Sequence, residues 1–189
     1  MNMNRTRNRI RESLETASRE LDLWCFESPE LLSYPPRSGW SALQILEHVS
    51  LTNHYLLILI RKGTKKALER AAQAGEPENR PEDGTHLDPL DEIASHGAFR
   101  WDCPAHMEPA GGKPPGEIRE ELKKQFGECA GHLEELRSGQ GTLHLTMMSV
   151  GSLGRIDVYQ YMYFLCLHAQ RHLAQLERVR KEYLAAHFA

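Results

Sequence analysis

The sequence lacks the features of membrane and secreted proteins. No apolar run approaches the roughly 20 residues that a helix needs to cross a bilayer, so we expect no membrane span. The first residues, MNMNRTRNRIRESLE, are polar and contain no apolar h-region, so they do not resemble a secretory signal, and we expect a cytoplasmic protein. No two cysteines form a CxxC pair, which argues against a zinc knuckle or a redox dithiol and favours buried thiols. The four cysteines are Cys25, Cys103, Cys129 and Cys166.

An excess of positive charge is missing as well. The formal net charge is -3, and although RTRNRIR is locally basic, the chain lacks the balance of a protein that neutralises many phosphates. Nucleic-acid binding is therefore not expected. The chain also contains no P-loop, no GxGxxG and no GxSxG element, so the commonest nucleotide-binding and serine-hydrolase motifs are excluded.

Apolar residues at helical spacing predict two helices in the first half of the chain. The first stripe steps by 4 and 3 residues and should end near Phe26, before ESPELLSYPPRSG. The second helix starts at Ser41, where Gln44 completes a capping box, and should stop at Gly75. The inward positions are Ile10, Leu14, Ala17, Leu21 and Trp24 in the first helix and Leu43, Leu46, Val49, Leu56 and Ile60 in the second.

Two further helices are predicted in the second half. The third runs from about Glu117 to Arg137, and the fourth is capped by Asp157 and Gln160 and reaches about Ala185. TLHLTMMSVGSLGRI, between them, should be short and irregular. Four amphipathic helices without a persistent strand pattern predict an all-α protein, a four-helix bundle, and 189 residues allow one domain over residues 1–189. The third helix should bury Ile118, Leu122, Phe126, Cys129, Leu133 and Leu136.

A long connection separates the second predicted helix from the third. Residues 76–116 hold seven of the ten prolines, and only DPLDEIASH looks helical, with Asp88 as its cap and Pro89 at its first position. Loops of this length are uncommon in compact domains unless they cover a site or are disordered. We therefore expect a role for 76–116 as a lid or an interface.

Two histidines occupy the stripe that the fourth helix should bury. Its inward positions are Val158, Tyr161, Leu165, His168, His172, Leu176 and Val179. A buried imidazole needs polar partners, and side chains one turn apart can grip a single ion. The HxxxH spacing alone is weak evidence for a metal, because a helix in a bundle can also satisfy its histidines through hydrogen bonds or a wet crevice. His48, at the edge of the second helical stripe, is the natural third ligand, and three imidazoles with one open position are typical of a catalytic zinc site.

Other histidine chemistry is disfavoured. The zincin motif HExxH needs a glutamate where this chain has Ala169, so no catalytic residue is predicted beyond the metal ligands. His144 is the one other histidine that could join the site, as a fourth ligand. We expect no site role for the remaining histidines or for the aromatic cluster of the fourth helix. These are His54, His86, His96, His106, His132, His187, Tyr159, Tyr161, Tyr163 and Phe164.

GWSALQILEHVSLTNHY, followed by GSLGRIDVYQYMYFLCLHAQRHLAQLERV, resembles the DinB-like superfamily, also called the DinB/YfiT-like metalloenzymes, in motif and in order. His48, His168 and His172 match the three metal ligands of that family. The resemblance implies an up-down-down-up four-helix bundle, a homodimer and a bound Zn²⁺ or Ni²⁺. A long connection between the second and third helices suits that topology, because parallel neighbours cannot be joined by a tight turn. Where many relatives carry a histidine-proline or phenylalanine-bearing turn, this chain has LTMMSVGSL.

The function implied by the resemblance is metal-dependent chemistry on a small molecule. Characterised relatives include transferases and isomerases that use bacillithiol, mycothiol or glutathione, so we expect a thiol S-transferase in detoxification or stress response, or a hydrolase. The alternatives are a non-enzymatic metal-binding stress protein, a dimeric bundle with a structural metal site, and a bundle whose histidines are only hydrogen-bonded. A fourth protein ligand would favour a structural site.

Overall fold

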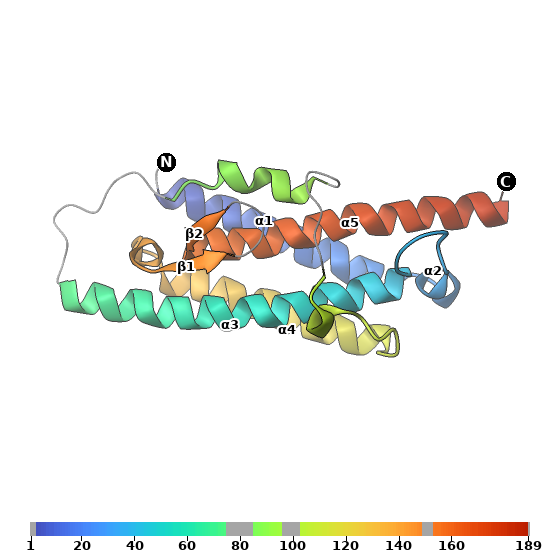
Figure 1. Ribbon diagram of the computed structural model, residues 1–189, viewed down its shortest axis with the longest axis horizontal. Helices are drawn as coiled ribbons and strands as arrows, with labels where there is room; N and C mark the ends of the chain where they lie inside the picture. Colours follow the sequence, from blue (N-terminus) through green and yellow to red (C-terminus); the bar gives the residue numbers. More distant parts are fainter. Residues whose placement is uncertain (1–2, 75–84, 96–102, 149–152, 189) are drawn as a thin grey trace.

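The computed structural model describes residues 3–74, 85–95, 103–148 and 153–188, and they are mostly helical (Figure 1). The long helices are α1 (Met3–Trp24), α3 (Ala42–Ala74), α4 (Pro115–Glu135) and α5 (Val158–Phe188). Between them lie the short helix α2 (Pro29–Ser33), the 3-10 helices η1 (Asp88–Ala94), η2 (Ala105–Met107) and η3 (Gln140–Leu143), and the strands β1 (Leu145–Met148) and β2 (Gly154–Asp157). None of the helices in the described ranges is long and apolar enough to span a membrane.

The four long helices lie side by side and enclose one hydrophobic core (Figure 1). α1 packs against α4 and α5, and α3 packs against the same two helices. The predicted inward residues of α1, α4 and α5 are all buried, as are those of α3 except Leu43, which is half-buried. Apolar periodicity therefore predicted correctly which face of each long helix turns to the core.

Side-chain caps set the start of α3 and of α5. Ser41 N donates to Gln44 Oε1 over 3.0 Å, and Gln44 N donates to Ser41 Oγ over 3.3 Å. Asp157 and Gln160 exchange the same pair of bonds, each 2.9 Å long. Both predicted capping boxes are confirmed, so the two helices that carry the histidines begin where the sequence indicates.

Several short elements differ from the sequence prediction. The segment expected to be a loop after α1 contains α2, whose Leu31 and Leu32 are buried. The stretch expected to be irregular contains an antiparallel hairpin of β1 and β2. Each strand has only 4 residues, too few to give a clear alternation of polar and apolar positions.

The connection between α3 and α4 is only partly described, because residues 75–84 and 96–102 lie outside the described ranges. Asp88 was predicted to cap a helix, which is wrong: η1 is a 3-10 helix with Leu87 at its cap and no side-chain capping bond. Asp88 instead accepts from Arg9 Nη1, at 2.5 Å, since an ion pair to α1 satisfies the carboxylate. Asp91 accepts from Arg9 and from the Tyr163 hydroxyl, so η1 is held against α1 and α5.

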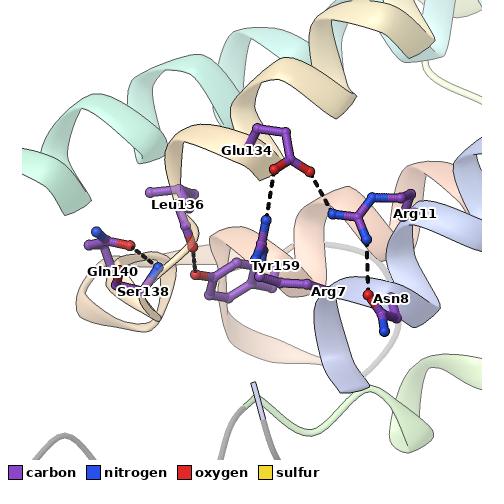
Figure 2. A network of polar contacts seen from close by, with 8 residues as sticks. All are labelled: Arg7, Asn8, Arg11, Glu134, Leu136, Ser138, Gln140 and Tyr159. Atoms are coloured by element: carbon purple, nitrogen blue, oxygen red, sulfur yellow. Dashed lines mark hydrogen bonds and ion pairs between the residues drawn. The ribbon is translucent and has the colours of Figure 1, made fainter. Parts of the chain in front are cut away.

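A polar network ties α1 to the end of α4 and the start of α5 (Figure 2). Arg7 and Arg11 both donate to the carboxylate of Glu134, at 2.9 and 2.6 Å. The hydroxyl of the fully buried Tyr159 donates to the carbonyl oxygen of Leu136. These contacts anchor the first turn of α5, the helix that carries two of the three candidate ligands.

Candidate metal centre

Three imidazoles meet between α3 and α5. His48 comes from α3, and His168 and His172 come from successive turns of α5. Their side chains are buried, with 6%, 2% and 7% exposure, and one ring nitrogen from each lies within 4.8 Å of the others. The structure therefore brings together the three residues that the sequence analysis selected, although they are spread over much of the chain.

The two histidines of α5 face each other through their outer nitrogens. Nε2 of His168 and Nε2 of His172 are 3.1 Å apart. An ion bound about 2.0–2.1 Å from each of two nitrogens holds them about 3.0–3.4 Å apart, depending on the coordination angle. The spacing of this pair fits a first-row divalent ion without movement of α5.

The second nitrogens of two of the rings have identified partners. Nδ1 of His48 lies 2.8 Å from the carbonyl oxygen of Met107, and Nδ1 of His172 lies 2.9 Å from Oε1 of Gln175. A carbonyl oxygen only accepts, so Nδ1 carries the proton and Nε2 keeps its lone pair. This tautomer suits a metal ligand whose Nε2 binds the ion. Trp40 also lies against His48, with ring centroids 4.7 Å apart.

The surroundings keep the three rings neutral at physiological pH. Burial lowers the pKa of His48, and the hydrogen bond to Met107 opposes that effect only in part. The pKa of His168 lies well below its ordinary value because of burial and the neighbouring His172 and His48. Burial, followed by the proximity of His48, lowers the pKa of His172 to about 3. Neutral imidazole is the form that binds metal ions.

No fourth protein ligand joins this set among the described His, Cys, Asp and Glu residues. His144, the predicted candidate, packs near Gly63 and lies 3.2 Å from Thr146 Oγ1. Gly63 is fifteen residues beyond His48 on α3, roughly 22 Å along the helix, so His144 is far from the site. Cys103 Sγ lies 3.8 Å from His48, but at Nδ1, on the protonated edge of the ring.

The other histidines have no place at the centre. His54, His86, His106 and His187 are exposed, and His132 is half-buried beside the carboxylates of α4. His96 lies outside the described residues. The aromatic cluster of α5 is buried in the core, in agreement with its predicted packing role.

Sequence reasoning did not identify Met107 and Gln175. Gln175 follows His172 by three residues on one helix, so helical spacing could have suggested it. Met107 contributes a backbone carbonyl from η2, and no residue pattern signals such a contact. Both partners determine the tautomers of the rings through Nδ1.

Comparison with known proteins identifies the family of the chain. The family model described as the DinB superfamily matches residues 2–176, a range that includes all three histidines. Searches of curated proteins and of solved structures found no match. The family match spans nearly the whole chain, and we conclude that the chain belongs to the DinB superfamily.

Proposed function

We propose that His48, His168 and His172 bind one divalent ion, Zn²⁺ or Ni²⁺, and that the protein uses it on a small-molecule substrate. The observation that carries the proposal is the convergence of three buried, neutral imidazoles, two of them with Nε2 atoms 3.1 Å apart. Hydrogen bonds to Met107 O and Gln175 Oε1 occupy Nδ1 of two of the rings, and each of these two rings keeps its Nε2 lone pair for an ion.

Catalysis is favoured over a purely structural site by the number of ligands. Structural zinc sites are closed by four protein ligands, whereas catalytic sites use three and leave a position for water or substrate. The described residues supply three. An ion held in this way would lower the pKa of a bound thiol or water and so supply a nucleophile near neutral pH.

The protein's own residues would prepare the site rather than react. Met107 O and Gln175 Oε1 hold protons on Nδ1 of His48 and His172, which would leave the lone pair of each Nε2 available to the ion. Burial of all three rings limits water at the centre and keeps them unprotonated. No described residue supplies the glutamate base of a zincin, since Ala169 stands at that position.

For the substrate we propose a low-molecular-weight thiol, which would be transferred through sulfur to an electrophile. Membership of the DinB superfamily supports this choice, because characterised members of that superfamily include transferases that use low-molecular-weight thiols. A hydrolase with metal-bound water is the alternative that the same open position would allow.

We also propose the up-down-down-up connectivity of the family, within a single domain. In Figure 1, α1 and α5 run towards one end of the molecule while α3 and α4 run towards the other, which supports this order. The long connection between α3 and α4 supports it as well, because parallel neighbours need one.

Metal analysis of protein purified without nickel resin tests the binding proposal. We expect about one equivalent of Zn²⁺ or Ni²⁺ in the wild type and loss of it in His168→Ala. His54→Ala removes an exposed histidine from α3 and should keep the metal. Less than about half an equivalent in the wild type, unchanged in His168→Ala, would contradict the proposal.

A panel of thiols with a reporter electrophile then tests catalysis. Metal-loaded wild type should consume the electrophile with at least one thiol, and chelated protein and His168→Ala should not. Metal binding without turnover with any thiol or with hydrolysable esters would favour the non-enzymatic alternative.

A further inference from the structure

Residues 103–113, which we call the strap, cross α3 at the candidate metal centre. The strap contains η2 and contacts α3 (Figure 1). Met107 touches α3 twice: its carbonyl oxygen accepts from His48 Nδ1, and its sulfur lies 3.8 Å from Thr52 Oγ1. The strap thus supplies the atom that determines the tautomer of one proposed ligand.

The strap is held at a second point by Glu47. This glutamate directly precedes His48 on α3, and only 6% of it is exposed. Its Oε2 accepts from the backbone N–H of Gly111 over 2.7 Å. This distance is at the short end of the range for N–H···O hydrogen bonds, so the contact is well suited to fix a loop.

Gly111 is adapted to that contact. Its φ is +77°, in the left-handed region, and an added Cβ would lie 3.2 Å from the side chain of Gln44. Glycine adopts this backbone conformation without steric cost and lets the strap approach α3 closely. Glu47 therefore holds the strap at Gly111, and His48 holds it at Met107, four residues earlier.

We propose that Glu47 is a positioning residue of the metal centre: by holding Gly111 it keeps Met107 O against Nδ1 of His48 and so leaves Nε2 of His48 free to bind the ion. This inference rests on the proposed metal site. Glu47 touches neither the ion nor the substrate in this scheme. It acts through the strap and through the proton on His48.

Metal affinity, measured by competition with a chromophoric chelator, tests the role of Glu47. Glu47→Ala should weaken Zn²⁺ binding about 10- to 100-fold, the usual effect of losing a partner that orients a ligand. Glu47→Gln keeps an acceptor for Gly111 N–H and should stay within about threefold of the wild type. Rescue by glutamine would distinguish positioning from a requirement for charge near the ion.

Glu121→Ala is the matched control. Glu121 binds the end of the strap through Lys113 Nζ, at 2.8 and 2.9 Å, but does not contact the stretch between Met107 and Gly111. We expect its Zn²⁺ affinity to match the wild type. Unchanged affinity in a folded Glu47→Ala, or equal weakening in Glu121→Ala, would overturn the proposal. Should Glu47→Ala not fold, Glu47→Asp replaces it, because retracting the carboxylate by one methylene breaks the contact.

The tautomer of His48, read from long-range ¹H–¹⁵N correlations in metal-free protein, separates this inference from the metal proposal. The wild type and Glu47→Gln should carry the proton on Nδ1, while Glu47→Ala or Glu47→Asp should show mixed tautomers. A wild-type His48 without a proton on Nδ1 would refute the positioning role whatever the protein binds. A wild type with the expected tautomer that binds no metal would instead refute the proposed function.

Discussion

Replacing both histidines of α5 by leucine should separate metal binding from packing. His168 and His172 are buried on the stripe that continues with Leu176, and leucine has a similar volume to histidine. Replacing one histidine alone would leave Nε2 of the other against an apolar side chain. Replacing both removes both nitrogens of this contact, so the double change can be neutral or stabilising. In metal-free buffer at pH 7, the free energy of unfolding of His168→Leu/His172→Leu should be no more than about 1 kcal/mol below that of the wild type.

In the presence of Zn²⁺ the wild type should be more stable than the double variant. A ligand present at 100 to 1,000 times its Kd stabilises the folded state by about 2.7–4.1 kcal/mol. For a chain of this size, each kcal/mol corresponds to roughly 2–4 °C, so Zn²⁺ should raise the Tm of the wild type by about 5–16 °C. The double variant should show no such increase.

The stability of the metal-free wild type should also fall more steeply with decreasing pH than that of the double variant. The pKa of His172 falls from an ordinary 6.5 to about 3 in the folded state, so the unfolded chain takes up the proton first as the pH falls. Stability present above pH 6.5 is therefore lost between pH 6.5 and 3. From pH 7 to 5, metal-free wild type should lose about 2 kcal/mol through His172, and His168 adds a loss of the same sign. The double variant should lose correspondingly less.

Urea and thermal unfolding, followed by circular dichroism at both pH values with chelator or with Zn²⁺, measures all three effects. His54→Leu changes an exposed histidine of α3 and should behave as the wild type. An equal Zn²⁺ increase in Tm for the wild type and the double variant would refute the assignment of the ligands.

Two further predictions concern the frame that carries the site, and urea midpoints check both. Gly141→Ala should destabilise the fold by about 1–3 kcal/mol, because an added Cβ would lie 2.6 Å from the buried ring of Tyr159; Gly127→Ala, on α4 with no atom within 4 Å of the added Cβ, should not. A larger loss for Gly127→Ala would contradict this packing. Burial raises the pKa of Asp157, so the folded state loses stability as the pH rises through that raised pKa. Asp157→Asn keeps the cap without the buried charge, and its free energy of unfolding at pH 7 should equal or exceed that of the wild type. Asp157→Ala should lose about 1 kcal/mol with the cap, and the reverse order of these two variants would contradict the argument.

The long helices could be predicted because their information is local. Each stripe repeats over several turns, and the Ser41–Gln44 and Asp157–Gln160 boxes involve residues three positions apart. Short elements carry less of this information. The hairpin depends on the pairing of two four-residue strands with each other. Asp88 forms an ion pair with Arg9, 79 positions away, instead of the predicted helix cap.

The homodimer, the thiol substrate and the cytoplasmic location stay predictions. Each depends on surfaces or molecules beyond a single chain. For residues 76–116 the structure adds two contacts. The strap, near the end of this range, lies against His48, and η1 packs on α5.

By itself, the sequence determined that His168 and His172 point inward, since helical periodicity sets the direction of every side chain on α5. It also selected His48, first by its place at the edge of a stripe and then by family resemblance. Only the tertiary structure decided that the three rings meet within 4.8 Å, because that distance depends on how α3 packs against α5. The same holds for Met107 O and Gly111 N: backbone atoms have no residue type, so their contacts with His48 and Glu47 become visible only when the strap is placed on α3.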